Sequence, residues 1–289
     1  MPKQRISKTL IIGLGGTGNL ALKYAKKRYW ETYGKANDIS FSNFWKTGKF
    51  PLVDFLALDT DLKDLKAGID EKNQISASGE FKLSADEYSY LKVSDARSVI
   101  KDNPYIRRNW MPDNMVEQCD EISHGAGQFR AFGRLALTYH IENIKKRIKD
   151  KINAIHRFEN SQNQDYETAS ADINICFCFS ISGGTGAGMF MDIAFIAKEV
   201  LEDMNVSYCT QAYVIMPEIF DKIIKYPIKK DKIFGNAYGA LREIEFFMDS
   251  KYRNYYAEKN NNFQVLRTDE YGAEIGYRLD TGKPYDVIH

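Results

Sequence analysis

The sequence has few of the features that mark a secreted, membrane-bound or metal-clustering protein. Its 289 residues include only four cysteines, Cys119, Cys176, Cys178 and Cys209, whose spacing fits no metal site. Three of them lie in apolar, strand-like runs, so we expect buried free thiols in a reducing cytoplasm rather than disulfides. The basic N-terminus precedes only a short apolar run, which predicts no signal peptide. No later run is long enough to span a membrane.

The chain also has no excess of positive or negative charge. Its formal net charge is +1, which predicts neither a nucleic-acid partner nor binding to an anionic membrane. The basic stretch at residues 145–151 is interpreted as the solvated face of a helix, because no stacking aromatic residues alternate with it. Hydrophobic residues make up 44% of the chain and charged residues 27%, which is typical of a soluble globular protein.

Glycine, in contrast, is concentrated in two loops far apart in the chain, each after an apolar run. The first loop contains Gly13, Gly15, Gly16, Thr17 and Gly18, followed by Asn19 as a helix cap; the second contains Ser182, Gly183, Gly184, Thr185, Gly186 and Gly188. Glycines let several backbone N–H groups line one concave surface, and the helix that follows points its positive end there. We therefore expect phosphate binding, with Thr185 either contacting a phosphate or capping its helix.

Strand and helix patterns alternate along the chain, which predicts an α/β fold with a doubly wound, mostly parallel sheet and helices on both faces. We expect strands at 9–12, 53–58, 173–181 and 208–216, and helical patterns at 132–155, 189–204 and 237–249. A polar linker at 159–170, a lysine-rich loop at 222–232, a closing hairpin with turns near Gly272 and Gly282, and a strand starting at 286–289 are also predicted. One domain spans 1–289, with insertions at about 30–50 and 68–115. The second insertion is expected to be an irregular surface subdomain.

The first glycine loop alone is consistent with another class of protein. The spacing of Gly13, Gly15 and Gly18 fits the dinucleotide fingerprint of a Rossmann-type enzyme that binds a dinucleotide or an adenylate. That reading requires an acid about 20 residues later, whereas Asp59 follows after more than forty, and it does not explain a second glycine loop. The Gly-Lys-Ser/Thr ending of a P-loop is absent from both loops, which excludes that family.

Four segments in the same order resemble the tubulin/FtsZ superfamily, and most closely its divergent bacterial tubulin-like branch. They are Ile12-Gly-Leu-Gly-Gly-Thr-Gly-Asn19, Phe55-Leu-Ala-Leu-Asp-Thr-Asp61, Gly125-Ala-Gly-Gln128 with Gly133-Arg134, and Ser182-Gly-Gly-Thr-Gly-Ala-Gly188. The last is a near match to the tubulin signature, and the second has Asp59 where FtsZ has asparagine. The resemblance extends from the N-terminus to about residue 250.

This resemblance implies a guanine nucleotide, GTP or GDP, held with Mg²⁺. Gly125, Ala126, Gly127 and Gln128 would face the γ-phosphate, and Glu218 and Lys232 would match a ribose-binding acid and a nearby basic residue. Asp59 and Asp61 would lie near the Mg²⁺ and act through coordinated water, since Mg²⁺ retains much of its hydration; equally, both could be turn residues. Arg130 would stabilise γ-phosphate charge or pair with a surface carboxylate.

The resemblance also implies GTP-hydrolase activity and nucleotide-controlled assembly into filaments. In the superfamily a central helix binds the base, and an acidic loop from the neighbouring subunit supports hydrolysis. Because this sequence reaches His289 where the sixth strand starts, we expect it to lack both elements and the second domain, and we assign no catalytic residue. It should bind nucleotide weakly and hydrolyse it slowly. A third hypothesis is that the chain is a structural or interaction module that has kept the fold but does not hydrolyse nucleotide.

Overall fold

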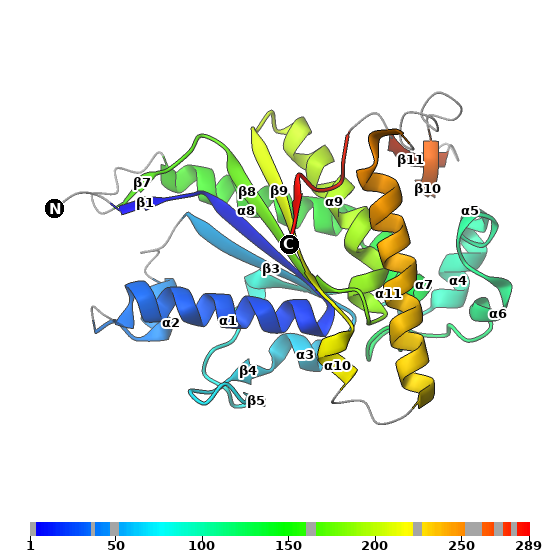
Figure 1. Cartoon of the computed structure of the whole chain (residues 1–289), viewed down its shortest axis with the longest axis horizontal. Coiled ribbons are helices and arrows are strands. Elements are labelled where there is room, and N and C mark those ends of the chain that lie inside the picture. The colour runs from blue at the N-terminus through cyan, green and yellow to red at the C-terminus, as the bar shows by residue number, and fades with distance from the viewer. Residues whose placement is uncertain are drawn as a thin grey trace.

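The computed structural model of the chain is organised around one six-stranded parallel sheet (Figure 1). It describes residues 4–35, 38–46, 52–159, 166–221, 227–251, 262–268, 274–278 and 282–289. Across the sheet the strands are β12 (Val287–Ile288), β9 (Tyr208–Ile215), β8 (Ile173–Ser180), β2 (Thr9–Leu14), β3 (Val53–Asp59) and β6 (Tyr88–Tyr90). The α/β fold class predicted from the sequence is confirmed.

Helices cover both faces of the sheet because successive strand residues point in opposite directions. In β2, Leu10 and Ile12 pack in one hydrophobic cluster, and Ile11 packs in the other. The first cluster includes residues of α7 (Arg130–Tyr139), α8 (Ile141–Glu159), α9 (Thr185–Asp203) and α11 (Pro227–Met248). The second includes residues of α1 (Gly15–Tyr33) and α2 (Phe41–Lys46).

The order of the strands determines where a ligand crevice can form. In chain order, β2 is the first strand of the large sheet, β3 the second, β6 the third and β8 the fourth, so their spatial order is 3-2-1-4-5-6. The direction of winding reverses between β2 and β8, and open parallel sheets bind ligands at the carboxyl ends of the strands at such a point. Both glycine segments follow these two strands.

Residues 68–115 depart from the sequence prediction, because they are not an irregular surface subdomain. They supply β6 to the sheet, and Leu91, Val93 and Ile106 lie in the larger core cluster. The segment contains β4 (Gly68–Ile69), β5 (Ile75–Ser76), the 3₁₀-helix η2 (Ala85–Glu87), α4 (Ala96–Asp102), α5 (Pro104–Asn109) and α6 (Asp113–Val116). Elements this short do not repeat an apolar period, so the sequence pattern did not reveal them.

Two helical predictions also need correction. The pattern at 132–155 belongs to two helices, α7 and α8, which are separated at His140. The helix predicted at 237–249 begins ten residues earlier, at Pro227, so the expected lysine-rich loop is helical from that residue; residues 222–226 lie outside the described part. Proline suits a first helical turn, where its missing N–H is not needed. Two short helices, α3 (Leu62–Lys66) and α10 (Glu218–Asp221), follow the carboxyl ends of β3 and β9.

The shorter strand pairs agree in part with the elements predicted from the sequence. The predicted closing hairpin is present as antiparallel β10 (Asn262–Thr268) and β11 (Glu274–Arg278), while its turn near Gly272 lies outside the described residues. Gly282 has a positive φ of 90°. The predicted final strand is β12, which pairs with β9. Within the expected polar linker, β7 (Tyr166–Thr168) pairs with β1 (Gln4–Ile6).

The cysteines and the longer helices test two further predictions, one on the burial of the thiols and one on membrane-spanning segments. All four cysteines are free; Cys119 is buried, whereas the other three are only partly buried, which corrects the expectation that they are buried. Within the described ranges, no helix combines the length and the apolar character needed to cross a membrane.

Candidate nucleotide-binding site

The first glycine segment joins β2 directly to α1 without an intervening loop. Leu14 is the last strand residue, and the helix begins at Gly15, whose φ of +68° is accessible to glycine at little cost. No side chain caps this helix, and its first turn contains no acidic residue. Its first N–H groups therefore have no side-chain partner in the cap, and their positive end is not neutralised. The prediction that Asn19 caps the helix is wrong, because Asn19 lies in its second turn.

The second glycine segment joins β8 to α9 through a short loop, residues 181–184. The strand ends at Ser180, and the helix begins at Thr185 with Gly184 as its N-cap residue. This helix also lacks a side-chain cap and a first-turn acid. Thr185 is the first helical residue, so the alternative in which its hydroxyl caps the helix is wrong. Two helices of 19 residues thus begin with N-termini that no side chain caps and no first-turn acid neutralises.

These two junctions lie against each other in space. Leu14 is opposite Phe179 in the parallel pairing of β2 with β8, so both strands end at the same level. A methyl group placed on Gly15 would lie 3.0 Å from the backbone nitrogen of Gly186 and 3.3 Å from Cβ of Thr185. Two segments separated by about 170 residues of sequence therefore form one backbone surface.

A third segment, residues 125–128, closes this surface on another side. Gly125, Gly127 and Gln128 all have positive φ values, of 89°, 57° and 65°. A methyl group on Gly184 would lie 2.8 Å from the Phe129 nitrogen, which shows how tightly the second and third segments pack. The side-chain amide of Asn236, on α11, donates hydrogen bonds to the carbonyl oxygens of Gln128 at 2.9 Å and Ser182 at 3.1 Å. We call residues 13–19, 125–128 and 182–186 the glycine cradle.

The cradle has open space and polar groups that lack partners. A methyl group added to Gly183 or to Gly125 would meet no atom within 4 Å. Ser182 Oγ and Asn19 Oδ1 are buried, and neither has a hydrogen-bond partner in the described part of the chain. Buried polar atoms are rarely left without partners, so a bound polar ligand or ordered water would complete this site.

Asp59 is directed inward, where it holds the backbone of residues 60–61 and the side chain of Asn19 in the cradle. It is 2% exposed. Its Oδ1 accepts hydrogen bonds from the backbone N–H groups of Thr60 at 2.7 Å and Asp61 at 3.3 Å. Its Oδ2 accepts from Asn19 Nδ2 at 2.6 Å. Burial raises the pKa of Asp59 to about 7, and the neighbouring Asp64 carboxylate adds to this increase.

The acidic residues fit a magnesium ion only in part. Asp59 is buried and both of its oxygens accept hydrogen bonds from protein groups, which leaves little access for coordinated water. Asp61 is partly exposed and accepts from the backbone N–H of Lys63 at 2.8 Å, and Asp64 Oδ2 lies close to Gly16. Among the described residues, no three or more His, Cys, Asp or Glu side chains are grouped so as to hold a metal ion. A water-mediated role for Asp61 therefore stays a prediction.

The basic residues and Glu218 lie around the cradle in different ways. Arg130 forms an ion pair with Glu243 and donates to the Ala187 carbonyl at 2.9 Å, so it pairs with a carboxylate, the second of the two roles considered for it. Lys232 Nζ lies 4.7 Å from the centre of the Phe129 ring, beside the third segment. Glu218 is exposed at the start of α10, and no hydrogen bond joins its side chain to the described cradle residues.

Sequence reasoning missed several residues that build the site. Thr60 Oγ1 and Thr185 Oγ1 form a buried hydrogen bond at 2.7 Å. Lys23 is buried, and its Nζ donates to the Asp64 carbonyl at 2.5 Å; desolvation lowers the pKa of Lys23. Asn236 holds two segments together. Of these residues, only Thr60 could have been identified from the sequence, because it stands at the end of a predicted strand between Asp59 and Asp61, the two acidic residues expected near Mg²⁺.

The profile of a protein family described as tubulin like matches residues 10–289. The chain belongs to this tubulin-like family. The match covers nearly the whole sequence and includes all three cradle segments. None of the curated proteins matches the sequence.

Several solved structures are distantly similar to this tubulin-like chain. A CetZ from Methanosaeta thermophila is 15% identical with a TM-score of 0.40, and the match covers 91% of this chain and 61% of that protein. TubZ of a Clostridium botulinum phage is 13% identical with a TM-score of 0.41, covering 84% and 50%. FtsZ of M. jannaschii is 14% identical with a TM-score of 0.32, covering 80% and 51%. The chain thus spans about half to three fifths of the length of these proteins, and the family match remains the basis for its placement.

Proposed function

We propose that the glycine cradle binds the phosphates of a guanine nucleotide, and that the bound nucleotide controls self-assembly or partner binding. The observation that carries the proposal is the meeting of two uncapped helix N-termini, those of α1 and α9, at the carboxyl ends of adjacent strands. Each N-terminus offers N–H donors and a partial positive charge. Two such ends at one point suit a chain of phosphates better than a single phosphate.

Membership of the tubulin-like family supports guanine as the base, because no residue of the described cradle discriminates guanine from adenine. In this proposal Gly125, Ala126, Gly127 and Gln128 face the terminal phosphate, and the Thr185 hydroxyl accompanies the backbone N–H groups of its segment. Lys232 and Glu218 lie at the ribose end, and Asp61 contacts Mg²⁺ through water. The protein would act in the cytoplasm, where nucleotide and Mg²⁺ are available.

Hydrolysis is expected to be slow in this chain by itself. Phosphoryl transfer depends on charge stabilisation and on a positioned water molecule, and loss of the water-orienting group costs several orders of magnitude in rate. In the proposed site, the described residues supply donors for the phosphates, but we assign none of them as a catalytic base. A single-turnover assay with and without self-association would measure this dependence.

A binding experiment tests the proposal directly. GTP, GDP, ATP and NAD are titrated by calorimetry with Mg²⁺ present, first into the parent protein and then into Gly183→Val. Gly183 is the best position for a blocking side chain, because a Cβ there enters open space and needs no rearrangement of the fold. Gly15→Val would be less informative, since a φ of +68° disfavours valine and would strain the backbone itself. Gly235→Val, at an exposed and equally open position on α11, is the matched control.

We expect saturable binding of GTP and GDP, loss of at least tenfold in affinity for Gly183→Val, and no change for Gly235→Val. Tighter binding of NAD or ATP than of GTP would instead favour the Rossmann-type alternative. Absence of binding by every nucleotide would contradict the proposal and leave the interaction-module reading.

A further inference from the structure

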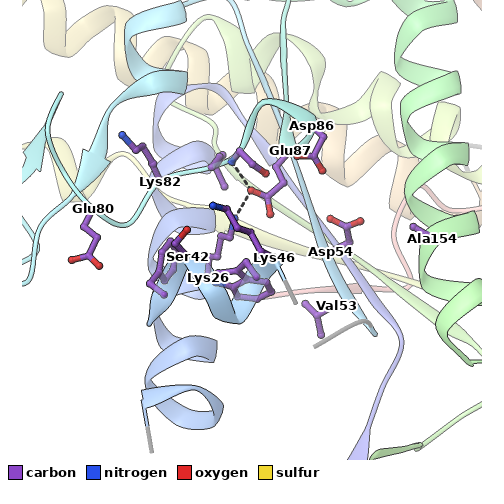
Figure 2. Close-up of a pocket in the computed structure, with 14 residues that line it drawn as sticks. Lys26, Ser42, Lys46, Val53, Asp54, Glu80, Lys82, Asp86, Glu87 and Ala154 are labelled. Atoms are coloured by element: carbon purple, nitrogen blue, oxygen red, sulfur yellow. Dashed lines mark hydrogen bonds and ion pairs between the residues drawn. The ribbon is translucent and has the colours of Figure 1, made fainter. Parts of the chain in front are cut away.

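We propose that this chain has a second ligand site, distinct from the cradle, that binds a small organic cation with a guanidinium or ammonium group. The site is a cavity of about 550 Å³ formed by α1, α2, the amino end of β3 and residues 80–87 (Figure 2). Small-molecule sites commonly have volumes of 300–1,000 Å³. This cavity takes no part in the function proposed above.

The cavity lies at the opposite end of the sheet from the cradle. Its residues Val53 and Asp54 begin β3, whereas Asp59 ends the same strand at the cradle. Asp59 is five positions further along the strand than Asp54, which corresponds to about 17 Å. A molecule in the cavity therefore does not occupy the place proposed for the phosphates.

One wall of the cavity is aromatic and already holds a cation. The Lys26 ammonium lies 5.1 Å from the centre of the Trp45 ring and 5.7 Å from that of Phe41, and it forms an ion pair with Glu87. Lys26 is 3% exposed, so this contact is made away from water. Aromatic faces attract ammonium and guanidinium groups, and more strongly where water is excluded. The same rings line the cavity and can contact a second cation.

The facing wall presents carboxylates that are only partly neutralised. Figure 2 shows Asp54 and Asp86 on one side of the cavity and Ser42 on the other. Lys151 is the shared partner of the two aspartates, at 2.8 Å from Asp54 and 3.2 Å from Asp86. Within the described part of the chain, Asp54 accepts hydrogen bonds through Oδ1 alone, so Oδ2 remains available to a ligand.

The charges of the inner wall favour a cation over an anion. Of the charged residues that line the cavity, Lys26, Asp54 and Glu87 are buried or half-buried, and together they carry a net charge of −1. Lys151 does not line the cavity and is shared between Asp54 and Asp86. Burial raises the pKa of Asp54 despite the nearby Lys151, as expected for a carboxylate with too little compensation. Lys46, Lys82, Glu80 and Asp86 also line the cavity, and all four are exposed, so water screens these two positive and two negative charges.

Two probes of similar shape and opposite charge test the site. Butylguanidinium and butyrate are titrated into the parent chain by calorimetry and by two-dimensional NMR. Asp86→Asn is the main variant, because the Asp86 side chain is 75% exposed and its change should not disturb the fold. Glu71→Gln, an exposed acidic residue outside the cavity, is the control for overall charge. Lys82→Gln removes a positive charge from the edge.

We expect butylguanidinium to bind saturably and butyrate not to bind. Loss of one charged hydrogen bond should weaken binding by roughly tenfold in Asp86→Asn, while Glu71→Gln changes nothing. Lys82→Gln should leave binding of the cation unchanged or strengthen it. Gly183→Val should bind the cation like the parent, which separates this site from the cradle. Preference for butyrate, weaker cation binding in Lys82→Gln, or equal binding by Asp86→Asn would overturn the proposal, as would absence of binding by both probes.

Discussion

The hydroxyl groups of Thr60 and Thr185 lie 2.7 Å apart in the core of the cradle, although 125 residues separate them in sequence. Thr60 follows β3 and Thr185 begins α9, so this hydrogen bond joins the ends of two structural units on either side of β2. Thr60 also accepts a hydrogen bond from the backbone N–H of Gly125 at 3.1 Å. One residue thereby connects the second and third cradle segments.

Thr185→Val should therefore destabilise the fold. The Thr60 hydroxyl, which is fully buried, would lose its partner at a cost of about 1–3 kcal/mol. Thr60→Val/Thr185→Val should recover part of this loss, because no hydroxyl is then left unpaired. Urea unfolding of the parent, both single variants and the double variant measures the coupling. Additive effects of the two substitutions would show that the hydrogen bond contributes little.

Asp59 should make the stability of the chain depend on pH. Its pKa rises from an ordinary 3.8 to about 7 on folding. Between these values the folded protein holds a proton that the unfolded chain has released. The contribution of this group is thus fully present below about pH 4 and is lost as the pH rises through 7, by about 4 kcal/mol in total.

Asp59→Asn should remove that dependence and be more stable than the parent at pH 8. Asn19 can turn its amide so that the unpartnered Oδ1 accepts from the new amide, which preserves the local hydrogen bonds. Urea unfolding in metal-free buffer at several values from pH 5 to 8 provides the measurement. A difference between parent and variant that stays constant over this range would mean that Asp59 has an ordinary pKa.

Asn236→Ala should loosen the cradle without altering its glycines. The variant loses the amide donor shared by the Gln128 and Ser182 carbonyls, at about 1–3 kcal/mol. Hydrogen exchange should become faster in residues 125–130 and 181–186, and nucleotide affinity should fall. Asn143→Ala, at an exposed position on α8, serves as the control. If hydrogen exchange in residues 125–130 and 181–186 is unchanged, contacts other than the Asn236 amide hold these two segments together.

Gln128→Gly should stabilise the fold by about 0.5–1 kcal/mol. Its φ of +65° lies in the left-handed region, which costs an L-residue about 1–2 kcal/mol, and the greater freedom of glycine in the unfolded chain offsets part of the gain. Gln128→Ala keeps the strained backbone and removes only the side chain, so it should show no such gain. Thermal unfolding distinguishes the two, and equal stability of both variants would contradict the assignment of strain.

The sequence predicted the cradle segments but not how they are built. Gly13, Gly15 and Gly18 stood out because a strand pattern ends there and a helix pattern begins. The first expected loop is in fact a direct junction of strand and helix, whereas the second is a loop of residues 181–184. Gly186 serves partly to pack α9 against β2, since a methyl group on it would lie 2.9 Å from the Leu14 carbonyl. Residues 68–115 were misjudged because their elements are too short for an apolar period to repeat often enough to be recognised.

By itself, the order of apolar, polar and glycine residues determined the α/β class, the long strands and the family. These depend on neighbours within each segment, where the spacing of side chains directly decides which face is buried. Only the tertiary structure decided that Thr60 meets Thr185, that Arg130 pairs with Glu243, and that Asn236 fastens two cradle segments. Contacts of this kind depend on the strand order and on the level at which each strand ends, and no local pattern encodes either.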